Sequence, residues 1–157
     1  MFLLFIRCFK MAYKGRFKPK CIDKYKGDPT KITYRSMWEL RFMRYLDSHP
    51  AVINWASEEV IIPYVSPIDK RVHRYFPDFW VRMQAENGAI NTVIIEIKPF
   101  RETKIPQRPE KLTRKFINEA RTYSVNAAKW KAAQEFCNDR NWQFKVLTEK
   151  ELGLDKL

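Results

Sequence analysis

Residues 71–100 read RVHRYFPDFWVRMQAENGAINTVIIEIKPF, and the rest of the chain is organised around them. The pattern predicts two β-strands joined by a turn at Asn87-Gly88. Alternation in the second strand, VIIEIK, places Glu96 and Lys98 on one face. Pairing through the turn brings Asp78, on the first strand, close to Glu96. We therefore expect two carboxylates and a lysine in one pocket.

This residue set has the chemistry of a metal-dependent nuclease site. Magnesium is commonly held by one or two carboxylates together with water and phosphate oxygens, which makes Asp78 and Glu96 the expected ligands. A divalent ion acidifies water and offsets charge on a phosphate, and Lys98 is placed to orient the attacking water. An isolated Glu-x-Lys is more often a solvated surface pair. The Pro77-Asp78 upstream and the apolar strand favour the catalytic interpretation.

Length and charge bound the protein class. With 157 residues the chain is long enough for one domain with a real core. Thirty Lys and Arg against eighteen Asp and Glu give a net charge of +12, spread over most of the length. Such a field favours a polyanionic partner, and nucleic acid is the commonest large one. Solubility or an acidic protein partner is the alternative explanation of the charge.

The cysteines and histidines argue against a zinc site or a disulfide framework. The chain holds three cysteines, Cys8, Cys21 and Cys137, without a Cys-x-x-Cys pair, and two histidines, His49 and His73. A bound metal is therefore expected to be a hard ion held by oxygen.

The N-terminus carries the short apolar patch MFLLFIRCFK. It is shorter than the roughly 20 residues of a membrane span and lacks the features of a cleaved signal. We expect Met11 to be the natural start, with residues 1–10 an upstream extension, and a cytosolic protein without a membrane partner.

Residues 1–31 are predicted to be an irregular basic arm, and residues 32–157 the nuclease-like domain. Lysines, prolines and aromatics alternate in the arm without a sustained period. Lys14, Arg16, Lys18 and Lys20 suit contact with DNA phosphates. A solvated arm held down by its aromatics is an equally good interpretation.

A helix is predicted from Ser36, which is the expected N-cap, to the stop at Ser48-His49-Pro50. Glu39 lies three residues after Ser36, at the spacing of a capping box. Glu39 is therefore either a capping carboxylate or a third acid turned toward the metal.

One further strand is predicted over 58–65, the first strand of the hairpin spans 72–83, and a basic loop follows Pro99. Pro63 suggests an edge or a bulge in the first of these strands. Arg74, on the second, is expected to face phosphate. The loop at the exit of the catalytic strand is well placed to grip DNA through Arg101, Lys104, Arg108 and Arg114, although a plain connection with solvated charges would look the same.

The C-terminal third predicts helix over 116–141 and a last strand over 142–148. A break near Ser124-Val125-Asn126 is expected to divide the helix in two, with Asn126 as the second cap. The element order, helix, three strands, helix, strand, predicts a single-domain α/β fold with a mixed sheet flanked by helices.

That order with those acids resembles the restriction-endonuclease-like fold of the PD-(D/E)xK nucleases. Pro77-Asp78 matches the Pro-Asp of the motif, Glu96-Ile97-Lys98 its (Asp/Glu)-x-Lys, and Glu39 its helix acid. The resemblance implies that Glu39, Asp78, Glu96 and Lys98 are catalytic, that Glu39, Asp78 and Glu96 hold the metal, and that Mg²⁺ is the cofactor, with Mn²⁺ an alternative.

A longer resemblance covers the chain from Met11 to about Gly153. The segments MAYKGRFKPK, KYKGDPTKITYRSMWE, RYFPDFW, IEIKP and TYSVNAAKWKAAQ resemble the head completion nucleases of contractile-tailed bacteriophages. A more distant similarity is to TnsA-type endonuclease subunits of transposition systems. The first resemblance implies a DNA endonuclease of the host cytoplasm and the virion, which acts at the capsid vertex after packaging and before tail attachment, with head, portal-vertex or neck proteins as partners.

Two alternatives follow from the same resemblances. One is a non-catalytic structural protein of the capsid vertex on a nuclease scaffold, and the other is a transposition endonuclease subunit. The intact set of acids weighs against the first, and the lack of a separate DNA-recognition domain weighs against the second. The oligomeric state and the DNA substrate are not encoded in any pattern of the sequence.

Overall fold

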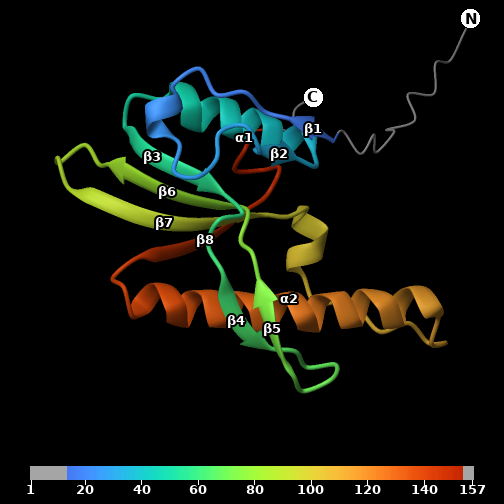
Figure 1. Ribbon diagram of the computed structural model, residues 1–157. Coiled ribbons are helices and arrows are strands. Elements are labelled where there is room, and N and C mark those ends of the chain that lie inside the picture. The colour runs from blue at the N-terminus through green and yellow to red at the C-terminus, as the bar shows by residue number, and fades with distance from the viewer. Residues whose placement is uncertain (1–13, 154–157) are drawn as a thin grey trace, which may run out of the picture.

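The computed structural model describes residues 14–153, which form a central sheet with a helix on each face (Figure 1). The sheet has the order β3-β6-β7-β8, and α1 and α2 lie on its opposite sides. The main elements are β1 (Gly15–Arg16), β2 (Thr33–Tyr34), α1 (Met37–Ser48), β3 (Val52–Ser57), β4 (Ile62–Val65), β5 (Val72–Tyr75), β6 (Phe79–Gln84), β7 (Ile90–Ile97), α2 (Arg114–Asn138) and β8 (Gln143–Leu147). Short 3₁₀ turns lie at Ile22–Lys24 (η1) and Phe100–Thr103 (η2).

The central sheet is mixed, as the sequence predicts. β6 pairs antiparallel with β3 and with β7, whereas β8 runs parallel to β7 after the crossover through α2. The β6–β7 hairpin turns where expected, with Gly88 at a φ of 84° that favours glycine. The predicted α/β class with a mixed sheet flanked by helices is therefore confirmed.

The main core lies between α1 and the sheet. Met43 and Leu46 of α1 meet Trp55 of β3 and Phe79 of β6, and all four side chains are almost fully buried. The predicted helix is confirmed, because the Ser36 hydroxyl accepts from the Glu39 amide at 3.1 Å and closes its first turn. Burial of this apolar face holds α1 on the sheet.

The described part of the predicted N-terminal arm packs on this same core. Phe17, Tyr25 and Ile32 are buried in it, and β1 pairs with β2 across the segment. The backbone N–H groups of Lys20 and Cys21 donate to the buried Asp47 carboxylate at 2.8 and 3.1 Å. Packing is thus continuous across the predicted boundary at residue 31, while the upstream extension 1–10 and Met11 lie outside the described residues.

The strands before the hairpin differ from the prediction. Strand β3 occupies residues 52–57, for which no element was predicted, and the strand expected over 58–65 is reduced to β4. The single strand expected over 72–83 is two strands, β5 and β6, separated by Phe76-Pro77-Asp78. Pro77 has no N–H to offer a ladder, and β5 instead pairs with β4 in a separate two-stranded sheet.

The predicted break in the second helix is wrong. α2 is continuous from Arg114 to Asn138, with Thr113 as its N-cap, and Asn126 is a buried residue of its interior. The Ser124 hydroxyl bonds back to the Arg121 carbonyl at 3.0 Å, which lets serine stay inside a helix.

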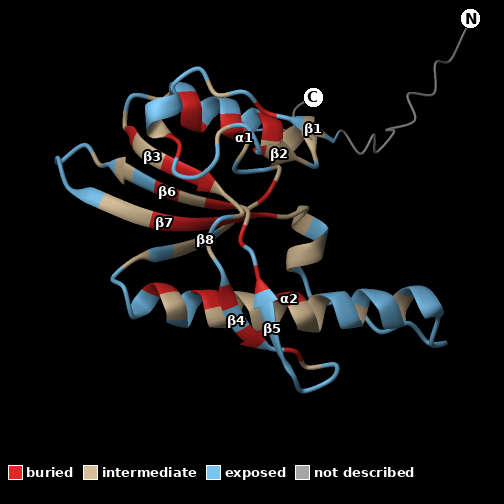
Figure 2. Ribbon diagram, viewed as in Figure 1, coloured by how far each residue is buried: buried red, intermediate tan, exposed pale blue. Residues whose placement is uncertain are grey.

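α2 supports the β4–β5 sheet through a second, smaller core. Tyr64 and Tyr75 pack there on Ala133 and its small neighbours. Figure 2 shows that this half of α2 is covered, whereas its N-terminal half is exposed. Within residues 14–153, neither helix has the length and apolar character needed to cross a membrane.

Candidate active site

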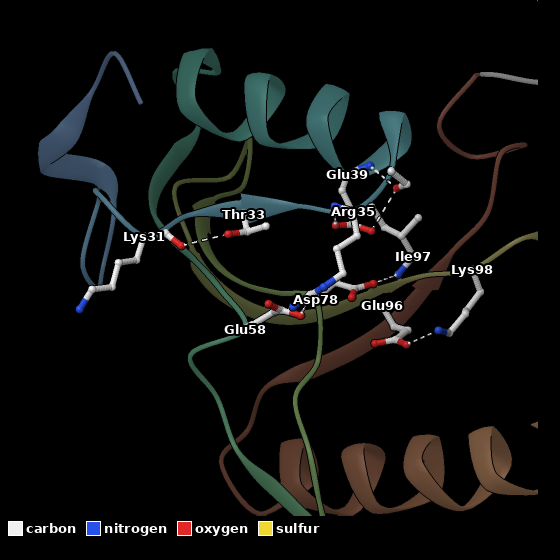
Figure 3. Close-up of polar contacts among 10 residues, drawn as sticks. Lys31, Thr33, Arg35, Glu39, Glu58, Asp78, Glu96, Ile97 and Lys98 are labelled. Carbon is white, nitrogen blue, oxygen red and sulfur yellow. Dashed lines mark hydrogen bonds and ion pairs between the residues drawn. The ribbon is translucent and has the colours of Figure 1, made fainter. Parts of the chain in front are cut away.

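The β6–β7 register brings Asp78 and Glu96 together. Phe79 pairs with Ile95, so Asp78 at the start of β6 falls opposite Glu96 near the end of β7. The Asp78 Oδ2 atom accepts a hydrogen bond from the Ile97 amide at 2.7 Å, which fixes its carboxylate beside β7 (Figure 3). The structure therefore gathers the two predicted strand acids from neighbouring strands.

Lys98 joins Glu96 on the same side of β7. Its Nζ lies 3.1 Å from the Glu96 Oε1 atom, and the exposed fractions of the two side chains are 27% and 6%. Burial by itself would lower the pKa of Lys98, but the carboxylates of Glu96 and Asp78 outweigh it and raise the pKa. Lys98 is thus a charged ammonium group, suited to stabilise negative charge and unsuited to accept a proton.

Tyr75 is a site residue that the sequence analysis missed. Its hydroxyl donates to the Glu96 Oε2 atom at 2.7 Å in a buried hydrogen bond. Burial, and then the Glu96 charge, raise the pKa of Tyr75, so the hydroxyl stays protonated and remains a donor. Both oxygens of Glu96 are therefore oriented, one by Tyr75 and one by Lys98.

If Glu96 holds Mg²⁺, replacing Tyr75 by Phe should raise the Mg²⁺ concentration for half-maximal activity by about tenfold, because groups that orient a metal ligand commonly contribute that much. Tyr64→Phe is the matched control, since Tyr64 packs in the same small core without bonding to Glu96. The measurement is a Mg²⁺ titration of cleavage rate together with Mn²⁺ affinity. Equal Mn²⁺ affinities for the two variants would show that the Tyr75 hydroxyl does not contribute to metal binding.

Glu39 lies near these acids but is engaged in capping α1. Its Oε2 atom accepts from the Arg35 amide at 2.8 Å, and its Oε1 atom accepts from the Ser36 hydroxyl at 3.0 Å. Its charge still reaches Asp78, where it is one of the causes of a raised pKa. The capping role is confirmed, and the role of Glu39 at a metal stays a prediction.

The electrostatics of the site favour a bound cation. Burial first, and then the nearby Glu96 and Glu39 charges, hold the pKa of Asp78 well above its usual range, against the opposing effects of the Ile97 amide and Lys98. Among residues 14–153, no group of three or more His, Cys, Asp or Glu is arranged to hold a metal ion. Asp78 and Glu96 nevertheless match the one or two carboxylates with which magnesium is usually held.

The predicted DNA contacts fall into separate places around the molecule. Arg16, Lys18 and Lys20 border a hollow of about 530 Å³ beside α1. Arg101 and Lys104 border another, of about 520 Å³, between η2 and the exposed half of α2. The remaining predicted contacts, Lys14, Arg74, Arg108 and Arg114, are all exposed. Neither hollow includes the strand carboxylates, so the structure does not bring these cations into direct contact with them.

The comparisons with known proteins agree with this geometry. The chain belongs to the TnsA-like endonuclease family: the model described as "TnsA-like endonuclease N terminal" matches residues 49–149, which is more than half of the 157 residues. It is also 45% identical over 146 residues to the head completion nuclease of Enterobacteria phage T4, a match that covers 90% of this chain and 95% of that protein. Both resemblances predicted from the sequence are thereby confirmed.

Proposed function

We propose that the protein is a magnesium-dependent DNA endonuclease that acts in phage head completion, with Mn²⁺ able to replace Mg²⁺. The observation that carries the proposal is the meeting of Asp78, Glu96 and Lys98 at the adjoining ends of β6 and β7. It occurs in a chain of an endonuclease family whose relative in phage T4 is named a head completion nuclease.

Each residue of the proposed site has a distinct task. Asp78, oriented by the Ile97 amide, and Glu96, oriented by Tyr75, supply the oxygens that hold the metal. Bound there, magnesium would acidify water and neutralise charge on the phosphodiester. Lys98 presents an ammonium group to the attacking water and to the negative charge that develops on the phosphate. Glu39 is proposed as a further ligand, direct or through water.

The exposed basic residues are proposed to hold the DNA backbone on either side of this site. One group of these residues follows β7 in the chain and consists of Arg101, Lys104, Arg108 and Arg114. The other lies near the start of the described chain and consists of Lys14, Arg16, Lys18 and Lys20. Arg74 lies four residues before Asp78, with its guanidinium 5.8 Å from the Phe76 ring centroid. Phosphate contacts of this kind give affinity that falls with salt and depends little on sequence.

In the cell, we propose that the enzyme trims DNA at the head vertex after packaging and before tail attachment, in the host cytoplasm and then in the virion. Its protein partners would be head, portal-vertex or neck components. The printed name of the T4 relative supports the part in head completion.

The decisive assay is nicking of supercoiled plasmid. With Mg²⁺ or Mn²⁺ we expect supercoiled plasmid to be converted to open circles and linear DNA. With excess chelator we expect no conversion, because Asp78 and Glu96 are anions and need the metal ion between them and the phosphate. Re-addition of Mg²⁺ should restore cutting. A purified wild type that cuts none of supercoiled, linear or branched DNA with either metal would favour a structural role at the vertex.

A further inference from the structure

Arg35 places a guanidinium at the edge of the acid site, and neither the motif nor the family match assigns it a role. It lies between β2 and the Ser36 cap of α1, and its backbone amide donates to the Glu39 carboxylate at 2.8 Å. Its Nη1 atom pairs with the Glu58 carboxylate. Glu58, and then Glu39 and Asp78, raise the pKa of Arg35 against the effect of burial. The guanidinium is therefore a permanent cation that the charges of Glu39 and Asp78 reach (Figure 3).

Glu58 holds Arg35 from a strained position. Its φ is 55°, in the left-handed region that non-glycine residues seldom occupy. Its backbone N–H donates to the carbonyl of Asp78 at 3.1 Å, so the strained residue is bonded directly to the proposed metal ligand that precedes β6. Strain of this kind persists where the surroundings impose it, and it is concentrated at functional sites.

The Arg35–Glu58 pair is accessible and leaves most of the guanidinium free. The exposed side-chain fractions are 55% for Arg35 and 32% for Glu58. Within residues 14–153, Glu58 is the only hydrogen-bond partner of the guanidinium, which uses Nη1 alone. An arginine presents five N–H donors in a planar fork that matches a phosphate. A pair this exposed contributes little because water screens it, so a phosphate can join it or replace it at little cost.

We propose that Arg35 is a catalytic residue that binds the scissile phosphate, and that Glu58 is the positioning residue that aims it. The proposal rests on the endonuclease function proposed above and adds a second protein cation to the site. Lys98 directly follows β7, whereas Arg35 precedes the Ser36 cap of α1. Arg35 would donate to a non-bridging phosphate oxygen as negative charge accumulates there.

The test separates cutting from binding. Single-turnover cleavage is measured with the enzyme in saturating excess over a fluorescent duplex in Mg²⁺, and affinity for the same duplex is measured by anisotropy with Ca²⁺. Arg35→Ala should cut about 100-fold more slowly, the usual cost of one lost donor to a developing oxyanion. Its duplex Kd should rise by less than about fivefold, because one phosphate contact of many is lost. Arg35→Lys should fall in between, since it keeps the charge and loses the fork.

Glu58→Gly is the companion variant, because glycine accepts the left-handed backbone and its introduction removes the whole Glu58 side chain with its carboxylate. It should keep or raise the melting temperature and still slow cutting by about tenfold, because Arg35 is no longer aimed at the phosphate. Arg41→Ala, which removes an exposed arginine of α1, is the charge control and should cut at the wild-type rate.

Three results would overturn the proposal. One is Arg35→Ala cutting within about threefold of the wild type at saturation. Another is a loss of affinity that accounts for the whole defect, which would make Arg35 a peripheral phosphate contact. The third is an equal defect in Arg41→Ala, which would make the effect one of net charge. A wild type that does not cut at all would instead overturn the proposed function, and these outcomes are distinguishable because the first three require an active wild type.

Discussion

Lys98→Met should reduce single-turnover DNA cleavage by about 1,000-fold while leaving the metal in place. The ammonium lies 3.1 Å from Glu96 and is charged, so its proposed work is to stabilise negative charge on the phosphate and to orient water. Removing one such donor from a preorganised site commonly costs 100- to 1,000-fold. Methionine keeps the length and apolar stem of lysine, so the fold should survive.

The same substitution should leave Mn²⁺ affinity unchanged or increase it. Lys98 is a cation next to the two carboxylates, and its removal lessens repulsion of a divalent ion. Isothermal titration with Mn²⁺ measures this directly. Lys145→Met is the matched control, because Lys145 is an exposed lysine on β8, paired with Ile95 of β7, and its loss should change neither quantity. Weaker Mn²⁺ binding in Lys98→Met would mean that the substitution damages the site, which would refute a purely catalytic role.

The part of the site that could be predicted from sequence is the part set by local geometry. A turn at Gly88 fixes the register of two adjacent strands, and the register fixes which residues face each other. Asp78 therefore meets Glu96, and the period of two along β7 brings Lys98 beside it. No long-range packing is needed for any of these inferences.

The contributions that could not be predicted come from elements brought together by packing. Tyr75 belongs to β5, in a different sheet from Glu96, and its hydroxyl reaches Glu96 only through the packing of the two sheets in the folded chain. The Arg35–Glu58 pair joins residues 23 positions apart, at the start of α1 and the end of β3. Since β3 was not predicted as a strand, that pairing had no basis in the sequence.

Tertiary contacts also explain the errors in secondary structure. Ser124 and Asn126 favour helix termini in isolation, yet both lie inside α2, where the hydroxyl of Ser124 bonds within the helix and Asn126 is buried. The β4–β5 sheet that packs on α2 stabilises the continuous helix more than local preference opposes it.

Asp78→Asn should abolish cleavage and, in metal-free buffer, stabilise the fold. Cleavage should fall by about 1,000-fold or more, because a neutral amide replaces one of two proposed metal ligands. The stability effect follows from the pKa of Asp78, which burial and the Glu96 and Glu39 charges raise. Asparagine resembles the protonated carboxyl, and its side-chain oxygen can still accept from the Ile97 amide.

The sign of the pH dependence is fixed by that raised pKa. In the folded state Asp78 favours its protonated form, so its contribution to stability is present below the pKa of an unfolded aspartate, about 3.9. That contribution is lost as pH rises through the higher pKa of the folded state. The advantage of Asp78→Asn over wild type should therefore be absent near pH 4 and grow toward pH 8, to on the order of 1 kcal/mol in the free energy of unfolding.

Thermal unfolding in chelator between pH 4 and pH 8 measures this advantage, and Asp69→Asn supplies a control of opposite sign. Hydrogen bonds from the His73 ring and from the Arg71 amide lower the pKa of Asp69. The contribution of Asp69 to folding stability is therefore present at neutral pH and is lost as pH falls through the lowered pKa. Mg²⁺ should narrow the gap between wild type and Asp78→Asn, because a cation favours the ionised carboxylate that only the wild type has. The contrary result is an Asp78→Asn variant that is less stable than wild type at pH 8 without metal. It would mean that the carboxylates of Asp78 and Glu96 do not repel each other in the folded protein, and it would contradict the close pair of acids inferred from the β6–β7 register.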